Sequence, residues 1–180
     1  MIIQQYKIVF AGSMGAGKTE AIRSLSDIPV LATEVLNTDA EAHQKAHTTV
    51  GIDYGDFTLA DGLTVGLYGT PGQSRFDFMW SIICKGAIGI VILIDHTHPE
   101  PLNELSIYID TFKEYGNNIA IGVTHHDEDA QKSLQPYRAW LAERQLKYPL
   151  FFVDARQSDH VLLLVDALIT PLEITTMTHG

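Results

Sequence analysis

The sequence predicts an α/β fold with a mostly parallel sheet of six strands, one antiparallel edge strand and helices on both faces. Short apolar runs rich in β-branched residues alternate with longer segments of helical periodicity, which is typical of a parallel sheet covered by helices. Two strand-like runs instead meet across the turn sequence Ala-Asp-Gly at 60–62, which predicts the antiparallel pair. A glycine-rich loop joins the first strand to the first helix.

The elements follow from local patterns along the chain. Buried strands are predicted where β-branched and apolar residues form short runs, at 7–11, 54–60, 63–68, 88–95, 118–124 and 149–155. Helices are predicted where apolar residues recur at helical spacing, at 18–26, 75–86, 102–116, 134–146 and 158–170. Ligands of such sheets bind at the carboxyl ends of the strands, so chemistry is expected in the loops that follow them.

Composition limits the possible functions. The 180 residues, 46% of them apolar, suffice for one well-buried domain spanning 1–180. A formal net charge of −10 disfavours a nucleic-acid-binding protein, because such proteins need Lys and Arg to displace counterions from phosphates. The single cysteine, Cys84, allows no internal disulfide and fits a reducing compartment. No signal peptide or lipidation motif is recognisable, so we expect a cytoplasmic protein without a stable membrane anchor.

The loop at 12–19 carries the strongest chemical signal. It reads Gly-Ser-Met-Gly-Ala-Gly-Lys-Thr between a predicted strand and a predicted helix. In this pattern the glycines let backbone N–H groups wrap a phosphate, and the helix N-terminus adds positive potential. Lys18 is expected to meet the outer phosphates, and the Thr19 hydroxyl to bind Mg²⁺. The pattern predicts a P-loop NTPase whose nucleotide is bound by Gly12, Ser13, Met14, Gly15, Ala16, Gly17, Lys18 and Thr19.

From this loop onward the chain resembles the Ras-like small GTPases, which implies a G domain that binds GTP or GDP with Mg²⁺. The segment at 47–55 resembles their switch I region, which implies that Thr49 senses the γ-phosphate through Mg²⁺, with Thr48 as the alternative. The segment at 69–76 resembles switch II, which implies that Gly72 donates its N–H to the γ-phosphate and Gln73 orients the attacking water. The implied catalytic residues are Gln73, Lys18 and Thr49, and the implied metal ligands are Thr19 and Thr49.

Two later loops resemble the base-reading loops of the same family. At 123–127 the chain reads Val-Thr-His-His-Asp, where Asp127 is retained and Thr124 and His125 replace the family's asparagine and lysine. A carboxylate there accepts hydrogen bonds from guanine N1–H and its exocyclic amine, a pair that adenine does not offer. At 153–156 the chain resembles the loop whose alanine backbone contacts the base. The resemblance therefore implies nucleotide contacts by Thr124, His125, Asp127, Ala155 and Arg156.

Gly69 departs from the family pattern, because switch II normally opens with an aspartate that helps hold magnesium. Thr19, Thr49, phosphate oxygens and water can complete an octahedral magnesium site without a carboxylate when GTP is bound. We therefore predict that the GDP form holds Mg²⁺ weakly and that a chelator hardly changes GDP release. Asp95 is the alternative source of the missing carboxylate.

The departures at Gly69 and at 124–125 are similar to those in a bacterial branch that includes gliding-motility polarity GTPases. That resemblance implies a switch controlling motility, polarity or surface filaments, a roadblock-type activator protein and further effector proteins. Switch I contains no obvious arginine between 28 and 48, so intrinsic hydrolysis is expected to be slow and accelerated by a partner.

Other interpretations of the sequence remain open. The strand ending at Asp95 also fits a Walker B strand, which favours a P-loop ATPase or kinase, although arginines to surround a transferred phosphate are few. A module that binds nucleotide without hydrolysing it is a further alternative. Six of the eight histidines occur in pairs, including His43 with His47 and His125 with His126, but no third ligand at a metal-binding spacing is visible.

Overall fold

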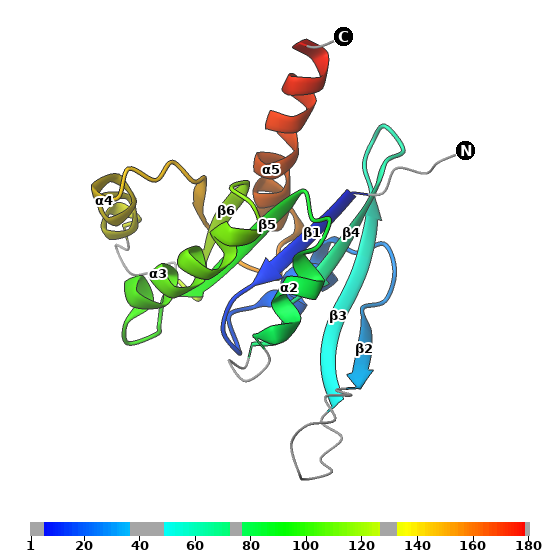
Figure 1. Ribbon diagram of the computed structural model, residues 1–180, viewed down its shortest axis with the longest axis horizontal. Coiled ribbons are helices and arrows are strands. Elements are labelled where there is room, and N and C mark those ends of the chain that lie inside the picture. The colour runs from blue at the N-terminus through cyan, green and yellow to red at the C-terminus, as the bar shows by residue number, and fades with distance from the viewer. Residues whose placement is uncertain (1–5, 37–48, 73–76, 127–132, 179–180) are drawn as a thin grey trace.

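The computed structural model describes residues 6–36, 49–72, 77–126 and 133–178. Its sheet has seven strands in the order β2-β3-β4-β1-β5-β6-β7 (Figure 1). All neighbouring strands are parallel except β3, which runs antiparallel to both β2 and β4. The strands span Tyr6–Ala11 (β1), Leu31–Leu36 (β2), Thr49–Thr58 (β3), Thr64–Gly69 (β4), Gly89–Asp95 (β5), Ile119–Thr124 (β6) and Leu150–Phe152 (β7).

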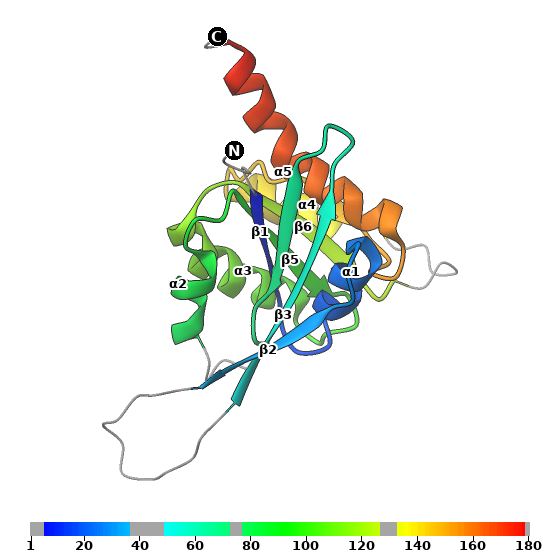
Figure 2. The ribbon, with the colours of Figure 1, turned by 90° about the vertical axis from the view of Figure 1, so that its right-hand side faces the viewer.

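Five α-helices of the described chain cover the two faces of the sheet (Figure 2). They span Lys18–Leu25 (α1), Phe78–Cys84 (α2), Pro101–Phe112 (α3), Gln135–Glu143 (α4) and Ser158–Thr178 (α5), with a 3₁₀ turn at Lys113–Tyr115. α1 and α5 pack on one face around Ile8 and Phe10 of β1. α2, α3 and α4 pack on the other face, around Val9 and Ala11. The alternation of these β1 residues follows the two-residue period of a strand buried on both faces.

The predicted fold class is confirmed, and the sheet differs from the expectation in one strand. β2 was not predicted, so the sheet has seven strands rather than six, and the antiparallel strand β3 lies inside the sheet rather than at its edge. The side chain of Leu31 in β2 is 54% exposed. Edge strands in general pair through the backbone and can keep side chains in solvent, so they need no strong apolar pattern in the sequence.

The predicted hairpin between β3 and β4 is present. Leu59 and Leu63 are joined by a backbone hydrogen bond of 2.8 Å, and the amide of Leu63 donates to Asp61 Oδ1 at 3.0 Å. Gly62 adopts φ 87°, a left-handed conformation that favours glycine. The hairpin fixes the register of the ladder, in which Asp53 pairs with Gly69.

The last helix is longer than its apolar pattern predicts. α5 runs to Thr178 and contains Pro171, whereas the predicted segment ends at 170. Its first half packs against the sheet through Val161, Leu164 and Leu168. Its second half extends beyond the sheet (Figures 1 and 2). Within the described residues, no helix combines the length and apolar character needed to cross a membrane.

Candidate functional site

The loop between β1 and α1 has a backbone that requires glycine at several positions. Gly12, Gly15 and Gly17 adopt φ values of 149°, 83° and 105°. A Cβ added to Gly12 would lie 2.5 Å from the carbonyl oxygen of Leu93, closer than real contacts allow. The predicted phosphate loop is thus followed by α1 and held against the end of β5.

Lys18, the first residue of α1, lies inside this loop. Its side chain is buried, and Nζ donates hydrogen bonds of 2.6 Å to the carbonyl oxygens of Gly12 and Ser13. Burial lowers the pKa of Lys18 to about 8, and the nearby carboxylates of Asp53 and Glu104 act in the opposite direction. A buried ammonium group stabilised mainly by loop carbonyls can readily exchange them for phosphate oxygens.

Thr19 is positioned by Asp53, a residue of the predicted switch I segment to which the sequence analysis assigned no role. Its hydroxyl donates a hydrogen bond to Oδ2 of Asp53, in the middle of β3. Asp53 is the cross-strand partner of Gly69. A Cβ built on Gly69 would lie 3.3 Å from Cβ of Asp53 and 3.2 Å from Cδ1 of Ile22. A carboxylate therefore lies beside Gly69, contributed by the neighbouring strand.

The loop after β6 is tied to the phosphate loop. The buried hydroxyl of Thr124 donates to the carbonyl oxygen of Ala16 at 2.8 Å, and the carbonyl oxygen of Ile94 lies 3.3 Å away. His125 has a positive φ of 57°, and its Nδ1 lies 3.0 Å from the Thr124 hydroxyl. The Thr124 side chain thus holds two loops together.

The loop after β7 also approaches the phosphate loop. A Cβ built on Gly17 would lie 3.0 Å from Cβ of Ala155, so the two residues are neighbours. The exposed guanidinium of Arg156 donates hydrogen bonds of 2.9 Å and 2.7 Å to the two carboxylate oxygens of Asp154. This pair holds the pKa of the Asp154 carboxyl well below its usual range. Arg156 is therefore bound within its own loop.

Asp95, the alternative metal-binding carboxylate, has other partners. Its Oδ1 accepts hydrogen bonds from the amide of Thr97 at 2.8 Å and from the Thr97 hydroxyl at 2.6 Å, and lies 3.5 Å from Nδ1 of His125. Burial raises the pKa of Asp95, but the Thr97 hydrogen bonds and the nearby histidines lower it overall. Asp95 thus stabilises the turn after β5, whereas Thr19 bonds to Asp53.

The start of the predicted switch II segment lies against the phosphate loop. A Cβ added to Gly72 would lie 2.6 Å from the backbone nitrogen of Met14. The indole Nε1 of Trp80 in α2 donates to the carbonyl oxygen of Pro71 at 3.4 Å. Gln73, Thr48 and Asp127 lie outside the described residues. Thr49 begins β3, where its backbone pairs with Leu36.

The side chains present fit a magnesium ion at Thr19. Mg²⁺ prefers oxygen ligands such as hydroxyl and carboxylate groups. Phosphate oxygens and waters usually complete its coordination sphere, rather than a set of protein ligands alone. Within the described chain, no three His, Cys, Asp or Glu residues group as a complete metal site. The histidine-based metal site is not found in that part, where His126 stacks on Phe152 with ring centroids 4.9 Å apart. His43 and His47 lie outside it.

The comparisons with known proteins agree with this geometry. The chain is 25% identical over 178 residues to the Ras-related protein RabC of Dictyostelium discoideum, covering 94% of this chain and 85% of that protein. It is 26% identical over 172 residues to the Ras-related protein Rab-7b of Mus musculus, covering 90% of this chain and 79% of that protein. The chain is similar to Ras-related small GTPases. No protein-family model matches it.

The solved structures identify the fold. The G domain of the T. maritima FeoB iron transporter superposes with a TM-score of 0.68 at 18% identity, over 93% of this chain and 98% of that one. This chain therefore has the G-domain form of the P-loop NTPase fold. The strand, glycine-rich loop and helix predicted at 7–26 are present, whereas Asp53 was not singled out because its contact with Thr19 depends on how the strands are placed.

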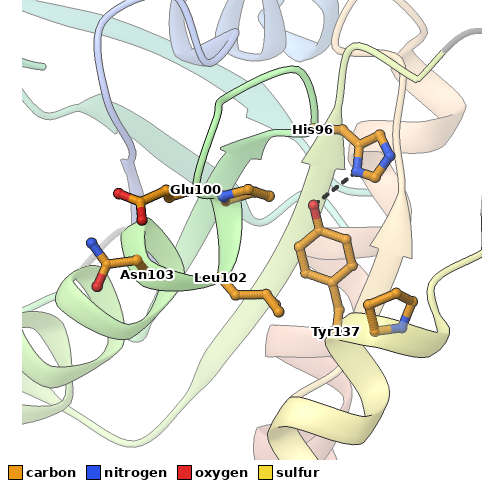
Figure 3. A pocket seen from close by; sticks show the side chains of 7 residues that line it. His96, Glu100, Leu102, Asn103 and Tyr137 are labelled. Atoms are coloured by element: carbon orange, nitrogen blue, oxygen red, sulfur yellow. Dashed lines mark hydrogen bonds between the residues drawn. The ribbon is translucent and has the colours of Figure 1, made fainter.

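A separate pocket of about 460 Å³ lies between the first turns of α3 and α4 (Figure 3). His96, Glu100, Leu102, Asn103 and Tyr137 line it together with Pro101 and Pro136. The Tyr137 hydroxyl and Nδ1 of His96 are 2.8 Å apart, and burial raises the pKa of Tyr137 to about 12. None of the predicted nucleotide-contacting residues is among those that line this pocket.

Proposed function

We propose that this protein is a GTP-binding molecular switch that hydrolyses GTP to GDP with Mg²⁺ as its cofactor. The observation that carries the proposal is the phosphate loop, where Gly12, Gly15 and Gly17 have positive φ and Lys18 and Thr19 open α1. Similarity to Ras-related proteins over most of the chain supports guanine nucleotide as the ligand.

The phosphates bind along this loop in the proposed complex. Backbone N–H groups of the loop and the N-terminus of α1 bind phosphate oxygens, and Lys18 exchanges its carbonyl partners for the outer phosphates. Thr19 and Thr49 are the proposed protein ligands of the metal. Mg²⁺, when bound, neutralises charge on the phosphate oxygens.

Hydrolysis in this proposal depends on positioning and electrostatic stabilisation. Gln73 orients a water molecule, whose oxygen attacks the γ-phosphorus while the bond to the bridging oxygen of GDP breaks. The products are GDP and inorganic phosphate; one proton of the attacking water stays on the phosphate and the other is released to solvent. The N–H of Gly72 and the ammonium of Lys18 stabilise charge on the transferred group.

Base selection in this proposal rests on Asp127, with Ala155 and His125 beside the base. Purified protein should be tested with GTP, inosine triphosphate and ATP as competitors of one labelled guanine nucleotide. Inosine lacks the exocyclic amine and loses one hydrogen bond to Asp127, and adenine loses both donors, so affinity should fall in that order. Equal affinity for ATP and GTP would contradict the proposal and favour a P-loop ATPase or kinase.

Turnover is proposed to be slow alone and faster with a partner, for which a roadblock-type activator is the proposed class. Motility, polarity or surface-filament control is the proposed cellular role, by resemblance of the switch II and base-reading loops. Phosphate release from GTP, with and without the partner, tests this. Gln73→Leu should keep nucleotide binding and lose stimulated release, whereas parent-like stimulation would exclude Gln73 as the water-orienting residue. No phosphate release under any condition would favour a non-hydrolysing binding module.

A further inference from the structure

We infer that Asp53 on β3 supplies the carboxylate that orients the magnesium sphere, a position that Gly69 on β4 leaves without a side chain. The inference rests on the proposed function and concerns which residue of this chain assists Thr19. Asp53 is a positioning residue in this role, because it acts through Thr19 and through metal-bound water.

Asp53 contacts Thr19 directly. Oδ2 of Asp53 accepts the hydrogen bond of the Thr19 hydroxyl, the side chain that follows Lys18 in the phosphate loop. A carboxylate that accepts a hydrogen bond from a ligand group orients that group and increases its affinity for the metal.

The register of the ladder between β3 and β4 places Asp53 beside Gly69. Asp53 and Gly69 are direct cross-strand partners, and their side-chain positions share one face of the sheet. A Cβ on Gly69 would be 3.7 Å from Oδ2 of Asp53 and 3.3 Å from its Cβ. A carboxylate on either strand would therefore occupy nearly the same place. Side chains at both positions would approach each other closely, so glycine at 69 leaves room for the Asp53 side chain.

Two other acidic side chains near the site, those of Asp95 and Asp56, have partners other than Thr19. Asp95 is committed to Thr97 and His125. Asp56, farther along β3, accepts a hydrogen bond from the Tyr54 hydroxyl at 3.1 Å. The carboxylate that accepts the hydrogen bond of the Thr19 hydroxyl belongs to Asp53.

The inference reverses the expectation drawn from Gly69 alone. If Asp53 orients the metal-bound waters, the GDP form keeps a carboxylate beside Thr19 and retains Mg²⁺. A chelator should then accelerate GDP release strongly, whereas the sequence analysis predicts little effect.

The test measures release of a fluorescent GDP analogue against free Mg²⁺ concentration. Asp53→Asn keeps the size and an oxygen acceptor for Thr19 and removes the charge. Asp56→Asn is the matched control, with the same change on the same strand. Asp53→Gly combined with Gly69→Asp moves the carboxylate across the ladder and removes the crowding between the two Cβ atoms.

We expect Asp53→Asn to need about 10–100-fold more Mg²⁺ for half-maximal slowing of release. Asp56→Asn should match the parent, and the double variant should recover the parent's Mg²⁺ dependence. An unchanged Mg²⁺ dependence in Asp53→Asn overturns the inference, as does an equal loss in Asp53→Asn and Asp56→Asn. The comparison of these two variants decides the matter even when the double variant does not fold. A parent that binds no guanine nucleotide would instead refute the proposed function.

Discussion

The hydroxyl of Thr124 donates a 2.8 Å hydrogen bond to the carbonyl oxygen of Ala16, joining the end of β6 to the phosphate loop. The resemblance to small GTPases placed an asparagine's base-contacting role at this position. The contact observed joins the short side chain at the end of β6 to the backbone of the glycine-rich loop that we propose wraps the phosphates. One buried hydroxyl thereby joins the two loops that we propose recognise the base and the phosphates.

Replacing Thr124 by Val should weaken this coupling. Val keeps the shape and removes the donor, which leaves the Ala16 carbonyl oxygen without this hydrogen bond and costs about 1–3 kcal/mol of unfolding free energy. GDP should also dissociate faster. Urea unfolding and nucleotide release measure the two effects. Thr124→Ser keeps the hydroxyl and is the control; if Ser and Val behave alike, the hydrogen bond does not explain the loss.

Trp80 should report the state of the bound nucleotide. Its indole donates to the carbonyl oxygen of Pro71, just before Gly72, and its ring packs 5.0 Å from that of Phe112. Trp140, the second of the two tryptophans, lies on α4 under the guanidinium of Arg144. Exchange of GDP for a non-hydrolysable GTP analogue should change the intrinsic fluorescence in Trp140→Phe and leave it unchanged in Trp80→Phe. A fluorescence change in Trp80→Phe but not in Trp140→Phe would show that the nucleotide-sensitive segment lies near Trp140 and not near Pro71.

Gly72→Ala should weaken GTP binding more than GDP binding. The added Cβ would meet the nitrogen of Met14 at 2.6 Å, so the segment must move away from the phosphate loop. Loss of a hydrogen bond to the charged γ-phosphate corresponds to about a tenfold or larger decrease in affinity. Competition binding with both nucleotides measures the ratio. Gly51→Ala, whose added Cβ meets no atom of the described residues within 4 Å, should keep the parent ratio.

The ion pair between Arg156 and Asp154 should make the free energy of unfolding depend on pH in the acidic range. Because the folded-state pKa of Asp154 is lowered, the pair stabilises the fold above the ordinary Asp value of about 4, and this is lost as pH falls through the folded-state pKa. Arg156→Gln should raise the pKa of Asp154 and flatten the pH dependence of unfolding below about pH 4. NMR titration of Asp154 measures the pKa directly. An unchanged titration would show that Arg156 does not hold the carboxyl.

Local patterns predicted the parts of this protein that depend on local chemistry. The phosphate loop has a fixed spacing, and the hairpin has a turn sequence ending in Gly62, which adopts the expected positive φ. The strand β2 and the contact of Asp53 with Thr19 were missed for a shared reason. Both depend on which residues meet across strands, and the pairing of Ala32, Asp53 and Gly69 has no signature in adjacent residues.

Asp53 lies within a ten-residue strand and is paired with Ala32 on one side and Gly69 on the other. A carboxylate at Gly69, the last residue of β4, would stand next to the segment that the proposed switch must reshape, whereas Asp53 lies within β3, away from the ends of that strand. This arrangement separates two duties that a single loop otherwise performs. A partner protein could remodel the residues after Gly69 to speed hydrolysis while the metal stays in place, so activation would not require the nucleotide to be lost.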